Sequence, residues 1–222
     1  ETTEVHFTPT VPGDYFYFGK TMEAGWSATP QPLFGARALD RALMGVLLVD
    51  APGEVRDPEE RILLLSHWAD QDDPGTYLPS VRYLVNGRAW PHTEHLEYAL
   101  GDTVRWRVIN QSGGFHPMHL HGFYFEVTQW TAATGRHLVP MPPEREDPIL
   151  AVTWPLPPTS AMRMEWVAHE PGNWLFHCHL MRHMSWVQVP DFASPGSHAS
   201  HAPPGPEGAD LQAGRLVRGT VH

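Results

Sequence analysis

Residues 177–183 read HCHLMRH and contain Cys178, the only cysteine in this chain of 222 residues. If the stretch begins as a β-strand, successive side chains point to opposite faces of the sheet. His177 and His179 then share one face, and Cys178 points to the other. The cysteine and its two neighbours cannot bind one metal ion in extended geometry, so the stretch predicts two metal sites on opposite faces of one strand.

A second cluster, HPMHLHG at residues 116–122, supplies the remaining ligands. His119 and His121 are two residues apart, so on a strand they point together and suit the same site as the paired histidines beside the cysteine. His116 and His183 remain to join the cysteine. Two histidines and one cysteine are the strong ligands of a type 1 (blue) copper site.

Zinc is the main competing metal, because it also accepts cysteine and histidine. Structural zinc sites normally use closely spaced CxxC or HxxxH pairs around one closed tetrahedron. Six histidines in two short clusters around one cysteine exceed that need. The sequence therefore favours copper over zinc.

Short strand-like segments separated by turn residues run along most of the chain. Val104, Trp106 and Val108 alternate with arginines, which is the period of a half-buried strand. Further strand-like segments are Thr3–Phe7, Tyr15–Phe18, Met44–Asp50, Ile62–Trp68, Tyr83–Asn86, Gly122–Trp130, Met162–Trp166 and Arg215–His222. With 23 prolines and 19 glycines in the chain, this pattern predicts an all-β sandwich or barrel.

Composition and charge exclude several classes of protein. The formal net charge of −10 makes the chain a poor nucleic-acid binder, because phosphate contacts need clustered cations. No apolar run reaches the length of roughly 18 to 20 residues that a membrane-spanning helix needs. A single cysteine cannot form an intrachain disulfide, so the fold does not rely on one.

The two histidine clusters resemble the two C-terminal copper motifs of multicopper oxidases, the laccase-like proteins. The resemblance extends to Asn86-Gly87 with Trp90-Pro91, to Gly101–Val104 and to Pro171–Trp174. It implies an all-β, cupredoxin-like Greek-key β-sandwich with copper as the cofactor. It also implies a reducing small-molecule or metal-ion substrate, dioxygen as the electron acceptor, and an extracellular or periplasmic location.

The resemblance assigns a role to each clustered residue. By motif position, the type 1 ligands are His116, Cys178 and His183, the type 2 ligand is His119, and the type 3 ligands are His121, His177 and His179. Cys178, His177 and His179 would form the catalytic path for the electron between the metal sites. In the full enzyme, single electrons taken from the substrate at type 1 copper would reduce dioxygen to water.

The N-terminal part departs from the family pattern. Residues 1–53 resemble the end of a first cupredoxin domain, followed by a linker at 54–61 and a copper-binding domain at 62–222. Phe18 and Lys20 occupy two places where the family has histidines. A full trinuclear centre in the family uses eight histidines, and this chain matches four. An upstream cupredoxin domain or a homo-oligomer is therefore an expected partner.

The axial ligand of the type 1 site is left open by the sequence. The family position, ten residues after the cysteine, is Gln188, and glutamine is a known weak axial ligand. If residues 190–210, rich in Pro, Gly, Ser and His, are an inserted flexible loop, the axial residue is instead Gln212 or Leu216.

A second class of function is also compatible with these motifs. A type 1 copper-binding or electron-transfer module without oxidase activity would explain Phe18 and Lys20. An electron carrier has no use for His119 and His121, however, so the intact HPMHLHG motif favours the oxidase.

Overall fold

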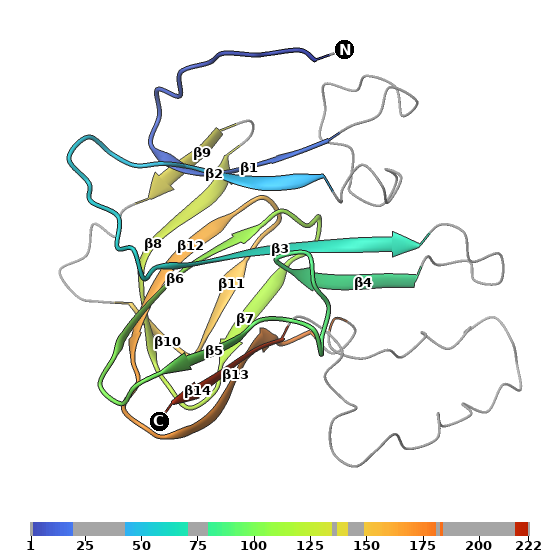
Figure 1. Ribbon diagram of the computed structural model, residues 1–222. Helices are drawn as coiled ribbons and strands as arrows, with labels where there is room; N and C mark the ends of the chain where they lie inside the picture. Colours follow the sequence, from blue (N-terminus) through green and yellow to red (C-terminus); the bar gives the residue numbers. More distant parts are fainter. Residues whose placement is uncertain are drawn as a thin grey trace, which may run out of the picture.

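The computed structural model describes residues 2–19, 43–70, 80–134, 137–141, 149–180, 183 and 216–221 (Figure 1). The elements with assigned bounds in these ranges are β-strands, arranged in three sheets. The larger sheet contains β3 (Arg61–Asp70), β4 (Ser80–Val85), β6 (Thr103–Asn110), β8 (Phe125–Thr134), β9 (His137–Met141), β10 (Leu150–Ala151) and β12 (Ala161–Val167). Its strand order is β10-β8-β12-β6-β3-β4, with β9 paired to β8.

A five-stranded sheet packs against this one and carries both histidine clusters. It contains β5 (His95–Tyr98), β7 (His116–Leu120), β11 (Thr153–Leu156), β13 (Gly172–Cys178) and β14 (Leu216–Val221). Its order is β11-β7-β13-β14-β5. Most of the first histidine cluster lies on β7, and the first two residues of the second cluster end β13, so the two clusters lie on neighbouring strands.

The main core lies between the two sheets. The ring centroids of Trp106 on β6 and Phe176 on β13 are 5.0 Å apart, and Trp106 also packs edge-on against Trp166 of β12. Strands such as β3, β6 and β12 contribute alternate residues to this core, as the period of two requires. Burying such large apolar side chains contributes about 1.5–3 kcal/mol each. The predicted sandwich is therefore held by aromatic contacts between its sheets.

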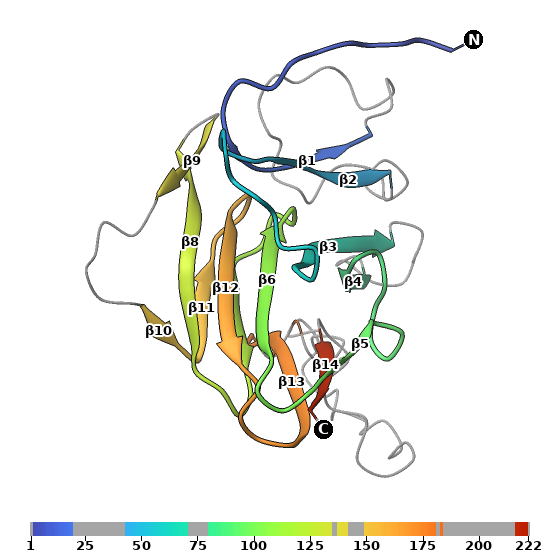
Figure 2. The ribbon, with the colours of Figure 1, turned by 60° about the vertical axis from the view of Figure 1, so that its left-hand side comes forward.

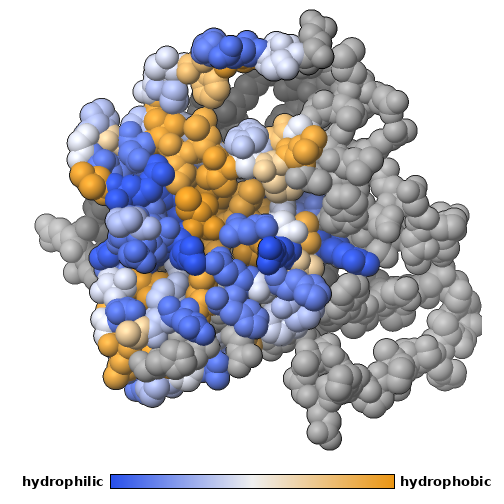
Figure 3. Space-filling model, viewed as in Figure 1, coloured by the Kyte–Doolittle hydropathy of each residue, from blue (hydrophilic) through white to orange (hydrophobic). Residues whose placement is uncertain are grey.

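A separate hairpin covers the outer face of the larger sheet. Its strands, β1 (Gly13–Phe18) and β2 (Met44–Val49), pair only with each other. Phe16 and the apolar residues of β2 pack on a small cluster formed by Leu64, Ile109 and Ala161. Figures 1 and 2 show this hairpin on one side of the sandwich, with β13 and β14 on the other side. In Figure 3, hydrophobic residues gather around the hairpin and the neighbouring sheet.

Ion pairs hold the hairpin to the sheet. Arg107 of β6 donates to Asp14 at the start of β1 at 2.5 Å and to Glu60 at 2.8 Å, and its side chain is 2% exposed. Arg163 of β12 donates to Glu54 at 2.5 Å. The acidic residues before β3 thus bind the arginines of the larger sheet, although the sequence predicted only a linker at 54–61.

Three details differ from the sequence-based expectations. The expected strand at Thr3–Phe7 is irregular and exposed, because no neighbouring strand pairs with it among the described residues. The strand expected from Gly122 begins at Phe125. Arg107, expected on the open face of a half-buried strand, is buried under the hairpin.

The division of the chain at residues 53 and 61 stays a prediction, although the hairpin lies in the first part and the two large sheets lie in the last. The expected loop at residues 190–210 lies outside the described residues. No helix in the described part of the chain is long and apolar enough to cross a membrane.

Candidate metal centres

Antiparallel pairing of β7 with β13 brings the two histidine clusters together. In this register His177 lies opposite His119, and Cys178 lies opposite Met118. Along β7 the side chains of His116 and Met118 are buried toward the core, while His119 is half-exposed on the other face. The strand alternation therefore separates the cysteine from its two neighbouring histidines, as the sequence predicted.

Three ligand atoms converge on the inner side of the sheet. The Cys178 Sγ atom lies 3.4 Å from Nδ1 of His116 and 3.4 Å from Nδ1 of His183. The two Nδ1 atoms are 2.9 Å apart. All three side chains are buried, with exposed fractions of 4% or less. A buried thiol and two imidazoles aimed at one point form a soft donor set that fits copper.

Tyr83 of β4 packs against both imidazoles of this cluster. Its ring centroid is 4.0 Å from that of His183 and 5.7 Å from that of His116. The His183 amide donates to the Leu180 carbonyl at 2.9 Å, which helps to hold His183 beside the cysteine. Sequence reasoning did not assign Tyr83 to the site, because β4 lies far from both clusters in the chain.

Four histidines gather on the outer side of the same sheet. The ring centroid of His119 lies 4.9, 5.5 and 5.1 Å from those of His121, His177 and His179, respectively. The Nε2 atoms of His121 and His177 are 2.9 Å apart. Ligand atoms of His119, His121 and His177 lie within 4.8 Å of one another. We call these four residues the four-histidine face.

Backbone carbonyls set the tautomers of two of these imidazoles. His119 Nδ1 lies 2.7 Å from the Val152 carbonyl, and His177 Nδ1 lies 2.9 Å from the Cys178 carbonyl. A carbonyl only accepts hydrogen bonds, so each Nδ1 carries the proton. The Nε2 atoms of both rings therefore present lone pairs, which is the form that binds a metal.

Burial favours the neutral imidazole at two positions of this face, His121 and His177. Desolvation lowers the pKa of His177 to about 4, with the neighbouring histidines adding to the effect. Desolvation, followed by repulsion from His119 and His179, also lowers the pKa of His121. Neutral imidazole is the metal-binding form, so the face suits a cation at neutral pH.

The remaining residues singled out by the sequence lie partly outside the described ranges. Gln188 and Gln212 lie outside the described residues, as does Lys20. Leu216 begins β14 directly opposite His177 in the sheet register. Phe18 lies at the end of β1 and is 48% exposed. The axial ligand of the cysteine cluster therefore stays a prediction.

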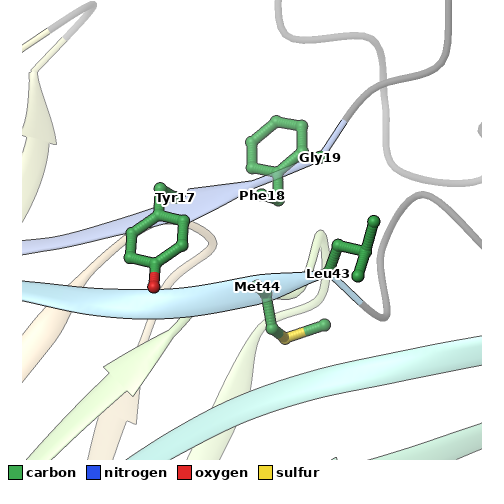
Figure 4. A pocket seen from close by; sticks show the side chains of 5 residues that line it. All are labelled: Tyr17, Phe18, Gly19, Leu43 and Met44. Atoms are coloured by element: carbon green, nitrogen blue, oxygen red, sulfur yellow. The ribbon is translucent and has the colours of Figure 1, made fainter. Parts of the chain in front are cut away.

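A shallow hollow of about 500 Å³ lies at the end of the hairpin where Phe18 pairs with Met44 (Figure 4). It is lined by Tyr17, Phe18, Gly19, Leu43 and Met44. None of these five residues is a histidine, cysteine or carboxylate, so the hollow has no metal-binding donor set of the kind found on the five-stranded sheet.

Comparison with known proteins matches the region that carries these sites. The model of the multicopper oxidase family matches residues 58–195, more than half of the chain. The iron transport multicopper oxidase fio1 of Schizosaccharomyces pombe is 30% identical over 100 residues, covering 42% of this chain and 15% of that protein. Laccase-14 of Arabidopsis thaliana is 31% identical over 96 residues, covering 43% of this chain and 16% of that protein. The alignments thus span less than a fifth of either relative.

Solved structures confirm the expected fold. The blue copper oxidase from Nitrosomonas europaea superimposes with a TM-score of 0.56 at 21% identity, covering 83% of this chain and 51% of that chain. The neighbours of this kind have the cupredoxin fold, which agrees with the two packed sheets described above.

Proposed function

This chain belongs to the multicopper oxidase family, and from that premise we propose that His116, Cys178 and His183 hold a type 1 copper ion. Copper is the cofactor that the family implies. The observation that carries the proposal is the convergence of one buried sulfur and two Nδ1 atoms, each 3.4 Å from the sulfur. When bound there, copper supplies one-electron redox chemistry, and the protein supplies the ligands and the dry surroundings.

We further propose that the four-histidine face holds the remaining copper. In this assignment His119 is the type 2 ligand, and the type 3 ligands are His121, His177 and His179. His177 and His179 are joined to Cys178 through the backbone, so two short covalent paths connect the cysteine with the opposite face. With copper bound at both sites, these three residues would provide the path for the electron from the cysteine cluster to the four-histidine face.

The proposed reaction of the whole protein is oxidation of a reducing small molecule or metal ion, coupled to reduction of dioxygen to water. The described part of this chain supplies half of the eight histidines expected for the oxygen-reducing centre. The β1–β2 hairpin packs on the outer face of the opposite sheet, so Phe18 lies across the sandwich from the four-histidine face. We therefore propose that a further cupredoxin domain or a second chain covers that face, in an extracellular or periplasmic protein.

The second candidate is an electron-transfer module without oxidase activity. It is favoured by Phe18, an exposed phenylalanine where the family pattern places a ligand. Hydrogen bonds to backbone carbonyls fix the tautomers of His119 and His177, so that the Nε2 atom of each ring presents a lone pair. This favours the oxidase, because an electron carrier with one copper ion does not need ligands for a second metal site.

Copper loading of Cys178→Ser and of His179→Ala tests the assignment. We expect the parent chain to bind one copper tightly and to be blue, through charge transfer from the Cys178 thiolate. Cys178→Ser should lose the colour and keep the weaker copper of the four-histidine face. His179→Ala, the matched control, should stay blue and lose part of the weaker copper. Metal analysis and visible absorption measure both results, and a blue Cys178→Ser protein would refute the type 1 assignment.

An oxygen electrode separates the two candidate functions. With only four of the eight ligands, the copper-loaded chain should not sustain oxygen uptake with a reducing substrate. Supplying the proposed further cupredoxin domain should give oxygen uptake if the protein is an oxidase. A blue protein that stays inactive when the whole polypeptide is supplied would instead support the electron-transfer module.

A further inference from the structure

A buried pair of polar side chains lies behind His116, on the side away from the cysteine. The Ser112 Oγ atom is 2.7 Å from Nε2 of His116 and 2.7 Å from Oδ1 of Asn110. All three side chains have an exposed fraction of zero. Buried polar groups of this kind keep their hydrogen bonds, because leaving one unpaired costs about 1–3 kcal/mol.

The orientation of the Asn110 amide follows from its neighbours. Its Nδ2 atom lies 2.8, 3.0 and 2.8 Å from the carbonyl oxygens of Gly114, Leu156 and Pro157. Carbonyls only accept, so the NH2 group must face them and Oδ1 must face Ser112. The Ser112 amide confirms this orientation, since it donates to Oδ1 at 3.0 Å.

The orientation of Asn110 then fixes the proton of the serine. The Ser112 hydroxyl has one proton, and its short contact with the Asn110 Oδ1 acceptor requires that the hydroxyl donate there. Its lone pairs are left for donors, and the Gly114 amide donates to one of them at 3.3 Å. The remaining contact, from His116 Nε2, must therefore be an N–H donating to Ser112 Oγ.

We propose that Asn110 and Ser112 are positioning residues that hold His116 in the Nε2–H tautomer. Its Nδ1 lone pair is thereby kept pointing at the cysteine and at His183 before any metal arrives. The inference rests on the proposed type 1 site and adds the source of its preorganisation. Partners of this kind typically change metal affinity by about 10- to 100-fold.

The metal-free protein tests the tautomer directly. Nitrogen-15 NMR of the histidine ring nitrogens distinguishes a protonated nitrogen from one with a lone pair. We expect a protonated Nε2 and an unprotonated Nδ1 for His116 in the parent chain. The reverse pattern would overturn the inference whatever the protein does with copper.

Ser112→Ala tests the consequence for the metal. We expect copper affinity, measured by competition with a chelator, to fall about 10- to 100-fold. The type 1 absorption and electron paramagnetic resonance signals should also shift. Ser112→Thr keeps the hydroxyl and should restore affinity and spectrum. The matched control is Thr131→Val, which removes a buried hydroxyl that accepts from the Ala161 amide at 2.9 Å, away from the hydrogen bonds of Asn110 and Ser112.

The outcomes separate this inference from the proposed function. If the parent chain is not blue with copper, the type 1 assignment fails, and the NMR result still decides the tautomer. If the parent is blue and Ser112→Ala matches Thr131→Val in affinity and spectrum, only the positioning role fails. Should Ser112→Ala not fold, the NMR tautomer of the parent and the behaviour of Ser112→Thr decide it.

Discussion

Replacing Arg107 with methionine removes a buried cation and keeps most of its apolar stem. The Arg107 guanidinium donates to Asp14 at 2.5 Å and to Glu60 at 2.8 and 3.2 Å, with both carboxylates largely buried. Without it, these two negative charges lose their main partner under the hairpin. Among the described residues, Asp14 keeps its contact with Arg163, at 3.5 Å. We expect the β1–β2 hairpin to loosen and the chain to lose stability.

The size of the loss follows from burial. Removing one member of a buried ion pair costs about 3–5 kcal/mol, and the remaining contact of Asp14 with Arg163 favours the lower end, about 3 kcal/mol. Arg105, two residues earlier on β6, is the matched control. It pairs with Asp57 and Glu165 at 2.7 and 2.6 Å, but its side chain is 43% exposed. Exposed pairs contribute about 0.2–1 kcal/mol each, so Arg105→Met should cost about 1 kcal/mol.

Urea unfolding of the metal-free variants measures the difference. With a slope of about 2 kcal/mol/M, the unfolding midpoint should fall by about 1.5 M for Arg107→Met and about 0.5 M for Arg105→Met. Salt should weaken the effect of Arg105→Met and leave that of Arg107→Met almost unchanged, because buried pairs are screened less. Equal midpoint shifts for the two variants would refute the argument from burial.

Two further predictions concern Gly122 and Glu54, an acidic residue of the expected linker. Gly122 has φ of +79°, and an added Cβ would lie 2.5 Å from the Trp174 ring, so Gly122→Ala should cost about 2–4 kcal/mol in urea unfolding. Gly53→Ala, at φ of +85° with open space, should cost only about 1–2 kcal/mol, and an equal loss would exclude the clash as a cause. A hydrogen bond from a backbone amide, and then Arg163, hold the pKa of Glu54 below 4.5. The ionised Glu54 therefore stabilises the fold above that pH, and this contribution is lost as the pH falls through the folded pKa. Glu54→Gln removes the contribution, so the urea midpoint of the variant should fall less steeply with decreasing pH than that of the parent chain.

The sequence alone was sufficient to predict the division of the clustered cysteine and histidine side chains between two faces. The reason is local: adjacent residues on a strand point in opposite directions, so Cys178 must separate from His177 and His179 wherever the strand lies. The same local rule predicted most strands, because alternation and turn residues are properties of short segments. It failed at Thr3–Phe7, where a strand-like segment has no pairing partner among the described residues.

Only the tertiary structure decided which partners each side chain meets. Arg107 reads as a solvent-facing residue of an alternating strand, and it is buried because a hairpin some 90 residues away packs over it. Tyr83 reaches the histidines of the cysteine cluster from β4, and Asn110 is oriented by carbonyls that lie up to 47 residues further along the chain. Such contacts depend on how sheets pack and how loops cross them, and no local pattern in the sequence encodes that arrangement.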